Sequence, residues 1–189
     1  MFVRLTGCPL RCGYCDTSYA FTGGEKKTLA EIIAQIDSYQ AKYITVTGGE
    51  PLAQSASLLL LSQLADKGYH VSLETSGALD VSKVDKRVVI VMDLKTPSSG
   101  ELSKNRYENI DYLESKDQIK FVIGTDEDYD WSKVMLSQYD LINRCQVLFS
   151  PVMGQMSPTR LAEKILQDKL LVRFQIQLHK YLWDDAQGK

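Results

Sequence analysis

Short apolar runs alternate with longer amphipathic segments along most of this chain. Runs rich in β-branched and aromatic residues predict seven strands, at residues 2–5, 43–47, 70–74, 88–94, 118–123, 145–149 and 171–178. Helical spacing of apolar residues predicts five helices, at residues 28–41, 55–67, 106–115, 129–142 and 158–168. Strands joined through helices form βαβ units with right-handed crossovers and parallel strands. The pattern therefore predicts an α/β fold built on a parallel sheet.

The number of these units limits the architecture. A complete eightfold barrel typically needs about 250 residues, which is more than the 189 residues of this chain. We therefore expect a single domain, residues 1–189, folded as an open partial (β/α) barrel of about six parallel strands. In such folds, ligands bind at the carboxyl ends of the strands, where the loops begin.

Loops with chemically useful residues follow five of the predicted strands. They read GCPLRCGYCDT, TGGEP, ETSG, DLKTP and SPVMG in chain order. Adjacent glycines in TGGEP allow the backbone to approach a ligand, and Glu50 offers an acceptor to an ammonium group; an ordinary strand-to-helix turn is the alternative. Lys95 lies two residues beyond Asp93 and predicts an ion pair at this edge, although most lysines are solvated surface residues.

Charge and hydropathy exclude several classes of protein. The formal net charge is −2 and no basic run is present, so the chain lacks the electrostatic signature of a protein that binds nucleic acid or an anionic membrane. No apolar run approaches the roughly 20 residues that cross a bilayer, and the first residues do not resemble a signal peptide. We expect a cytoplasmic protein.

Three of the four cysteines, Cys8, Cys12 and Cys15, fall within eight residues. In a reducing cytosol such thiols serve more often as ligands or catalysts than as disulfides. A zinc site usually needs four ligands, and only Cys145 and two histidines remain to complete one. A thioredoxin-like pair would leave Cys8 without a role, and the glycines between the cysteines are typical of a loop rather than a core. The other interpretation is an iron–sulfur cluster on three thiolates, with one iron open.

The spacing C-x3-C-x2-C, with Tyr14 before the last cysteine and GGEP about thirty residues later, resembles the radical S-adenosylmethionine (SAM) enzymes. In that family three cysteines bind a 4Fe–4S cluster, and SAM chelates the open iron through its amino and carboxylate groups. Within it, the chain is most similar to the 7-carboxy-7-deazaguanine synthase family. This resemblance is carried by FVRLTGCPLRCGYCDT, VTGGEP, ETSG, MDLKTPSSGE, FSPVMG and QLHKYL, which run through nearly the whole chain.

The resemblance implies roles for individual residues. The three clustered cysteines would hold the cluster, Thr17 would bind Mg²⁺ through its hydroxyl, and Arg4 and Thr47 would contact the substrate. No acid–base catalyst is implied, because the chemistry is radical chemistry on SAM. The implied SAM-binding residues are Tyr14, Cys15, Asp16, Gly49, Glu50, Ser76, Asp93, Leu94, Lys95, Ser150, Pro151, Val152 and Met153.

The implied reaction converts 6-carboxy-5,6,7,8-tetrahydropterin into 7-carboxy-7-deazaguanine with loss of ammonia, a carbon–nitrogen lyase step in queuosine and deazapurine biosynthesis. An adenosyl radical would remove the hydrogen at C6, the ring would contract, and the hydrogen would return to regenerate SAM. The implied partners are the pterin substrate, an electron donor of flavodoxin or ferredoxin type, and a second copy in a homodimer. Members of the family usually carry an upstream segment with a QGEG stretch, which we expect this domain to lack.

Two alternatives have different functions. A glycyl-radical enzyme activating enzyme shares the cysteine spacing, GGEP and a DLK-like segment, but CDT and SPVMG argue against it. A non-catalytic module that binds zinc or an iron–sulfur cluster would explain the cysteines alone, but not the five loops aligned at one edge of the sheet.

Overall fold

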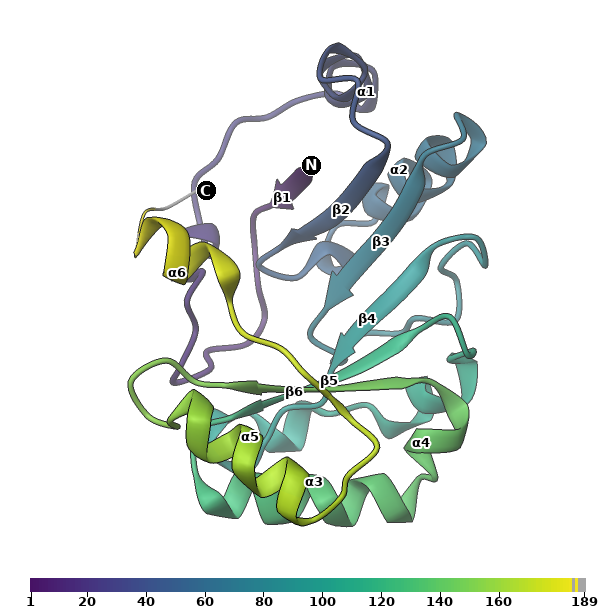
Figure 1. Cartoon of the computed structure of the whole chain (residues 1–189). Helices are drawn as coiled ribbons and strands as arrows, with labels where there is room; N and C mark the ends of the chain where they lie inside the picture. Colours follow the sequence, from purple (N-terminus) through teal and green to yellow (C-terminus); the bar gives the residue numbers. More distant parts are fainter. Residues whose placement is uncertain (185, 187–189) are drawn as a thin grey trace.

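The computed structural model of this protein describes residues 1–184 and residue 186. Seven parallel strands form one sheet in the order β1-β2-β3-β4-β5-β6-β7 (Figure 1). In the described part of the chain, β7 does not pair back with β1. The expected open partial barrel is therefore confirmed. The strands span Phe2–Leu5, Tyr43–Gly48, His70–Thr75, Val89–Asp93, Gln118–Ile123, Gln146–Pro151 and Arg173–Phe174.

Capping residues set where several helices begin. At α1, the Glu31 amide donates to the Thr28 hydroxyl, and the Thr28 amide donates to the Glu31 carboxylate at 2.7 Å. At α3, Thr125 and Asp128 form the same reciprocal pair. The helices α1 to α6 span Leu29–Ser38, Ala56–Asp66, Asp126–Gln138, Leu141–Arg144, Pro158–Gln167 and Leu178–Trp183. In the described residues, no helix is long and apolar enough to span a bilayer.

Three predicted elements differ from the structure. The helix expected at 129–142 begins earlier, because the Thr125 cap fixes its start, and it ends before Asp140, whose φ is 51°. The segment 106–115 forms only a 3₁₀ helix, in which the buried Asn109 side chain bonds to the loop after β3 and so shapes the backbone. Of the strand expected at 171–178, only Arg173–Phe174 pairs with β6, and α6 already begins at Leu178.

The two faces of the sheet differ in character. Alternate residues of the inner strands are mostly apolar side chains buried in the core beneath the helices, as Ile44, Val46, Leu73 and Met92 are. The residues between them face the open side and are mostly polar and half-buried, such as Thr45, Ser72, Glu74, Asp93 and Lys120. Figure 1 shows this open side, with the segment leading to α6 crossing in front of β5 and β6. The fold therefore leaves a polar surface next to the carboxyl ends of the strands.

Candidate active site

The loop after β1 carries the three clustered cysteines. Cys8, Cys12 and Cys15 are free thiols and all are half-buried. The Cys15 amide donates to the Cys12 carbonyl at 3.1 Å, which closes a turn between them. The exposed Arg11 supports the loop, because its guanidinium donates to the Cys8 and Leu10 carbonyls at 2.7 Å each. This role of Arg11 was not predicted from the sequence, and its position between Cys8 and Cys12 was the available signal.

The GGEP turn after β2 packs directly on the cysteine loop. The Gly49 amide donates to the Leu5 carbonyl at 2.9 Å, and the Glu50 amide donates to the Gly7 carbonyl at 2.7 Å. A Cβ at position 49 would lie 2.3 Å from the Gly7 oxygen and 3.0 Å from the Cys8 Cβ. Only glycine permits this approach, so the adjacent glycines bring the second loop against the predicted cluster ligands.

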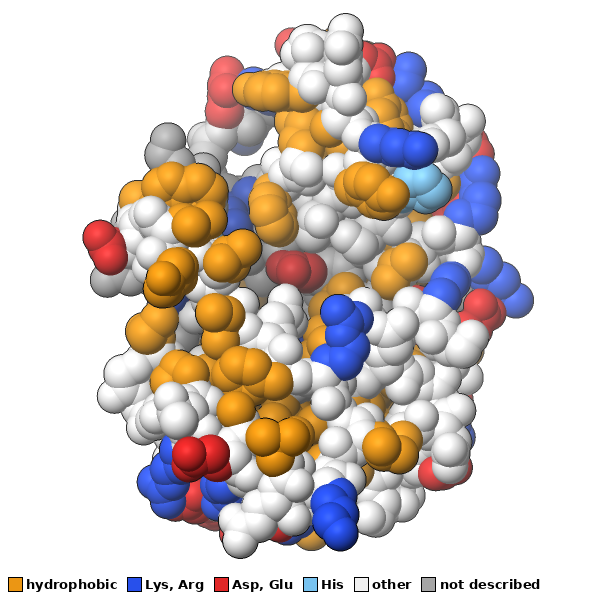
Figure 2. Space-filling view, in the orientation of Figure 1, with side chains coloured by type: hydrophobic (Ala, Val, Ile, Leu, Met, Phe, Trp, Pro, Cys, Tyr) orange, Lys and Arg blue, Asp and Glu red, His pale blue; other side chains and the backbone are white. Residues whose placement is uncertain are grey.

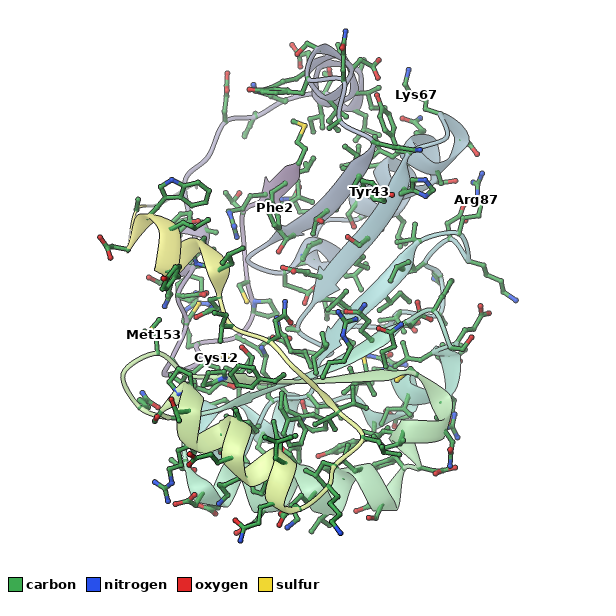
Figure 3. All side chains as sticks on the ribbon, in the orientation of Figure 1. Phe2, Cys12, Tyr43, Lys67, Arg87 and Met153 are labelled. Atoms are coloured by element: carbon green, nitrogen blue, oxygen red, sulfur yellow. The ribbon has the colours of Figure 1, made fainter. Side chains whose placement is uncertain are left out.

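The loop after β4 contacts the cysteine loop from the other side. The Gly13 amide donates to the Ser99 carbonyl at 3.0 Å, and the Tyr14 hydroxyl lies 3.4 Å from the Thr96 hydroxyl. Figure 3 shows Cys12 and Met153 on the same side of the molecule, where Met153 is 53% exposed. Three of the predicted loops therefore meet at the cysteines, and the end of β6 lies on the same side.

An ion triad of the buried Lys95 with the half-buried Asp93 and Lys120 lies beside this junction. The Lys95 ammonium is 2.7 Å from one oxygen of Asp93, and the Lys120 ammonium is 3.1 Å from the other. Burial opposes the charge of Lys95, but the Asp93 carboxylate, together with Cys12 and Tyr14, raises the pKa of Lys95 above its usual value. Burial also opposes ionisation of Asp93, yet Lys120 and Lys95 together hold the pKa of Asp93 below its usual value. The predicted pair of Asp93 and Lys95 is confirmed, and Lys120 is an addition that the sequence did not indicate.

The thiols are placed where metal binding would favour their ionised form. Burial raises the pKa of Cys8 and of Cys12, while the Lys95 ammonium acts in the opposite direction on both. A metal ion deprotonates its thiol ligands, so binding one at these cysteines would release their protons. In the described residues, no three His, Cys, Asp or Glu side chains gather around one point as a mononuclear site requires. A cubane has a different requirement, since each thiolate binds its own iron, and one compact loop with three thiols fits it.

Glu50 lies inside the junction of the second and third loops. Its side chain is 0% exposed, and its carboxylate accepts from the Thr75 hydroxyl, the Ser76 amide and hydroxyl, and the Leu52 amide. The carboxylate is thus occupied by protein donors. The predicted contact of Glu50 with SAM remains a prediction, and it would require some of these bonds to exchange.

Thr17 and Asp16 end the cysteine loop. The Thr17 hydroxyl donates to one Asp16 oxygen at 2.8 Å, and the Gln177 side-chain amide donates to the other. A hydroxyl that donates its proton in this way keeps its lone pairs for a cation. Oxygen donors of this kind fit Mg²⁺. The contact from Gln177 also ties the segment before α6 to the cysteine loop.

The predicted substrate contacts lie on the open face of the sheet. Arg4 of β1 pairs in register with Thr47 of β2. The Thr47 hydroxyl in turn donates to the Glu74 carboxylate of β3 at 2.9 Å. The Arg4 guanidinium lies over the Tyr19 ring, 5.6 Å from its centroid. Sequence reasoning named Arg4 and Thr47 but not Glu74, which only the sheet register brings beside them.

The remaining predicted SAM residues are mostly buried around the ends of β3, β4 and β6. Leu94 lies next to the ion triad, and the Val152 amide donates to the Ile123 carbonyl at 2.8 Å. These residues carry no charged groups. The buried members are Ser76, Leu94, Ser150, Pro151 and Val152.

Comparison with known proteins points to one family. The family described as the Radical SAM superfamily matches residues 2–99. A protein from Chlorobaculum tepidum called 7-carboxy-7-deazaguanine synthase is 43% identical over 191 residues, covering 99% of this chain and 87% of the relative. A protein of the same name from Koribacter versatilis is 38% identical, covering 97% of this chain and 88% of the relative.

Solved structures share the fold. QueE from Escherichia coli aligns with a TM-score of 0.68 at 21% identity, covering 93% of this chain and 84% of that protein. SuiB from Streptococcus suis aligns with a TM-score of 0.64 at 14% identity, covering 93% of this chain and 48% of that protein. At these identities the likeness concerns the arrangement of strands and helices.

Proposed function

Because this chain belongs to the radical SAM superfamily and, within it, to the 7-carboxy-7-deazaguanine synthase family, we propose that it converts 6-carboxy-5,6,7,8-tetrahydropterin into 7-carboxy-7-deazaguanine with loss of ammonia. The observation that carries this proposal is the cysteine loop, whose half-buried free thiols lie against the GGEP turn and the loop after β4. Loss of ammonia breaks a carbon–nitrogen bond, which makes the enzyme a lyase.

The cysteine loop would hold a 4Fe–4S cluster through Cys8, Cys12 and Cys15, with one iron open to SAM. When bound, the cluster and SAM supply a carbon-centred radical that removes a hydrogen from the substrate. The chain itself orients the loop and limits access of water to the thiols, as the burial of Cys8 and Cys12 indicates. The glycine contacts and the Arg11 bonds keep that loop compact.

The open face of the sheet would receive the substrate. Arg4 can pair with a carboxylate through a bidentate fork, and Thr47 beside it would restrict the orientation of the pterin. The Thr17 hydroxyl would contribute one ligand to Mg²⁺, whose other ligands would be substrate oxygens and water. The Thr17 hydroxyl would hold this ion next to the substrate carboxylate, where it would supply Lewis-acid chemistry.

Anaerobic reconstitution tests the proposal. The protein is loaded with iron and sulfide, then incubated with SAM, a chemical reductant and the carboxytetrahydropterin, and the products are identified by mass spectrometry. Formation of 7-carboxy-7-deazaguanine supports the proposal. Cleavage of SAM that depends on a protein partner would instead indicate a glycyl-radical activating enzyme. Iron binding with neither reaction would indicate a non-catalytic module.

Two variants separate the roles of the loop residues. Cys12→Ala removes a cluster ligand and is expected to abolish the iron–sulfur absorption. Thr17→Ala leaves all three thiols in place, so it should retain the cluster and lose mainly the turnover that depends on Mg²⁺. Undiminished turnover by both variants would contradict the assignment. A flavodoxin or ferredoxin as electron donor and a homodimer are further parts of the proposal, to be checked by reduction assays and by light scattering.

A further inference from the structure

Two hydrogen bonds hold the backbone on either side of Cys12. The Arg11 amide donates to Oε1 of Glu101 at 2.5 Å, and the Gly13 amide donates to the Ser99 carbonyl at 3.0 Å. Both acceptors belong to residues 97–101, which are part of the loop after β4. One short segment therefore fixes the backbone of this predicted cluster ligand from both sides.

The segment 97–101 is anchored in the core. Asp128, on the first turn of α3, is 0% exposed, and its carboxylate accepts from the Ser98 amide at 2.8 Å and from the Ser98 hydroxyl at 2.5 Å. Gly100 then turns the chain with a φ of 74°, a conformation that favours glycine. The Glu101 amide donates to the Ser99 hydroxyl at 3.1 Å. An ordered turn therefore presents Glu101 to the cysteine loop.

The charge of Glu101 has no cationic partner. On the open face of the sheet, acidic and basic side chains lie near one another (Figure 2), and Asp93 there is neutralised by Lys95 and Lys120. In the described part of the chain, no lysine or arginine forms an ion pair with Glu101. Burial is the largest of the causes that raise the pKa of Cys12, and the carboxylates of Asp93 and Glu101 are among the others. The negative charge of Glu101 therefore acts on the Cys12 sulfur.

Both contacts of Glu101 bear on the reduction of a cluster held by Cys12. Reduction adds one negative charge to the cluster, so a nearby carboxylate disfavours the reduced form. Backbone N–H groups that bond to the sulfurs of a cluster have the opposite effect, because they stabilise negative charge there. Glu101 accepts from the Arg11 amide and so keeps that donor away from the sulfurs. Both effects lower the reduction potential, which makes the cluster a stronger reductant toward the sulfonium of SAM.

We propose that Glu101 is a positioning residue that holds the backbone at Cys12 and keeps the reduction potential of the cluster low. This inference rests on the proposed function, because it takes a 4Fe–4S cluster as the group that the cysteines bind. The two parts of the role depend on different properties of the side chain. An acceptor oxygen is enough to hold the Arg11 amide, whereas the full effect on the potential needs the charge of the carboxylate.

Three variants separate these two properties. Glu101→Gln keeps an acceptor oxygen and removes the charge, and Glu101→Ala removes both. Glu163→Gln makes the first change at an exposed position on α5 and is the matched control. Each protein is reconstituted anaerobically with iron and sulfide. The measurements are the iron content, a redox titration monitored by EPR, and the amide hydrogen exchange of residues 7–17.

We expect Glu101→Gln to retain its iron and to be reduced more easily. At a fixed applied potential, the ratio of reduced to oxidised cluster should rise roughly tenfold because one nearby negative charge is lost, and this corresponds to about 59 mV for a one-electron couple. Glu101→Ala should show at least the same shift and lose part of its iron. Its Arg11 amide has no acceptor left, so hydrogen exchange there should be roughly tenfold faster. Glu163→Gln should match wild type in all three measurements.

Several results would overturn the proposal. If Glu101→Gln has the reduction potential of wild type, or loses as much iron as Glu101→Ala, the charge of Glu101 does not act on the cluster as proposed. If Glu101→Ala keeps the iron content and the amide exchange of wild type, Glu101 does not hold the cysteine loop. Should wild type form 7-carboxy-7-deazaguanine in either case, the proposed function stands and only the role of Glu101 is wrong. If wild type assembles no cluster, the proposed function fails and the inference fails with it.

Discussion

Glu50→Gln tests how much the buried carboxylate between the second and third loops stabilises the fold. In the structure, one oxygen accepts from the Leu52 amide at 2.9 Å, and the other accepts from the Ser76 amide at 2.7 Å. The Thr75 hydroxyl lies 3.0 Å from each oxygen. Glutamine has the same shape, but it replaces one of the two acceptors with an NH₂ group.

The expected cost follows from which donors can adjust. Hydroxyl groups can rotate toward another acceptor, whereas the amides of Leu52 and Ser76 are fixed by the backbone. One of these amides would face the new NH₂ group and lose its partner, which costs about 1–3 kcal/mol. The hydrogen bonds that remain become weaker, because their acceptor is a neutral amide oxygen instead of a charged carboxylate. Removing a buried charge offsets part of this, so we expect a net destabilisation of about 2–4 kcal/mol.

Urea unfolding of the reconstituted protein, followed by far-UV circular dichroism under anaerobic conditions, measures this change. With an m-value of about 2 kcal/mol/M, the midpoint should fall by about 1–2 M. Glu163→Gln makes the same chemical change at an exposed position and should leave the midpoint unchanged. A Glu50→Gln midpoint equal to that of wild type, at an unchanged m-value, would refute the reasoning.

Three further predictions concern the cysteines and their surroundings. Gly49→Ala should lose most bound iron, because its Cβ would lie 2.3 Å from a backbone oxygen of the cysteine loop. Gly13→Ala should retain its iron, because its Cβ would lie 3.8 Å from the nearest atom, the Ser98 carbonyl oxygen. Equal iron content in the two variants would contradict this prediction. Lys95→Met should make the midpoint potential of the cluster more negative and Asp93→Asn more positive, because they remove charges of opposite sign; shifts in the same direction in an EPR-monitored titration would contradict it. Burial raises the pKa of Cys145 to about 11. Its alkylation in the native protein should therefore be slow at pH 8 and about tenfold faster for each pH unit, as the thiolate fraction rises. An alkylation rate that does not depend on pH, measured by mass spectrometry, would contradict this prediction.

Some parts of the fold were predictable because they depend on local patterns. The alternation of apolar runs and helical segments indicated a parallel sheet, and Thr28 with Glu31 marked the start of α1. The pattern failed for residues 171–178, where alternating apolar residues suggested a long strand. There the chain lies at the edge of the sheet, and Phe174 and Ile176 remain 39% and 42% exposed. Alternation alone does not reveal whether a neighbouring strand exists to pair with.

The sequence by itself determined that the three clustered cysteines lie together in one loop, and which loop follows which strand. Cys8, Cys12 and Cys15 lie so close along the chain that one loop must present them together, and that spacing depends on no distant contact. It also indicated the pairing of Asp93 with Lys95, since residues two apart at the end of a strand share a face.

The tertiary structure decided which charged groups are free to bind a ligand. Lys120 neutralises Asp93 and Thr47 orients Glu74 across strands that are far apart in sequence. Glu50 stands in the most recognisable motif, yet its carboxylate is occupied by donors from another loop. The availability of a polar group is set by its hydrogen-bond partners in space, and those partners exist only once the sheet has brought the strands into register.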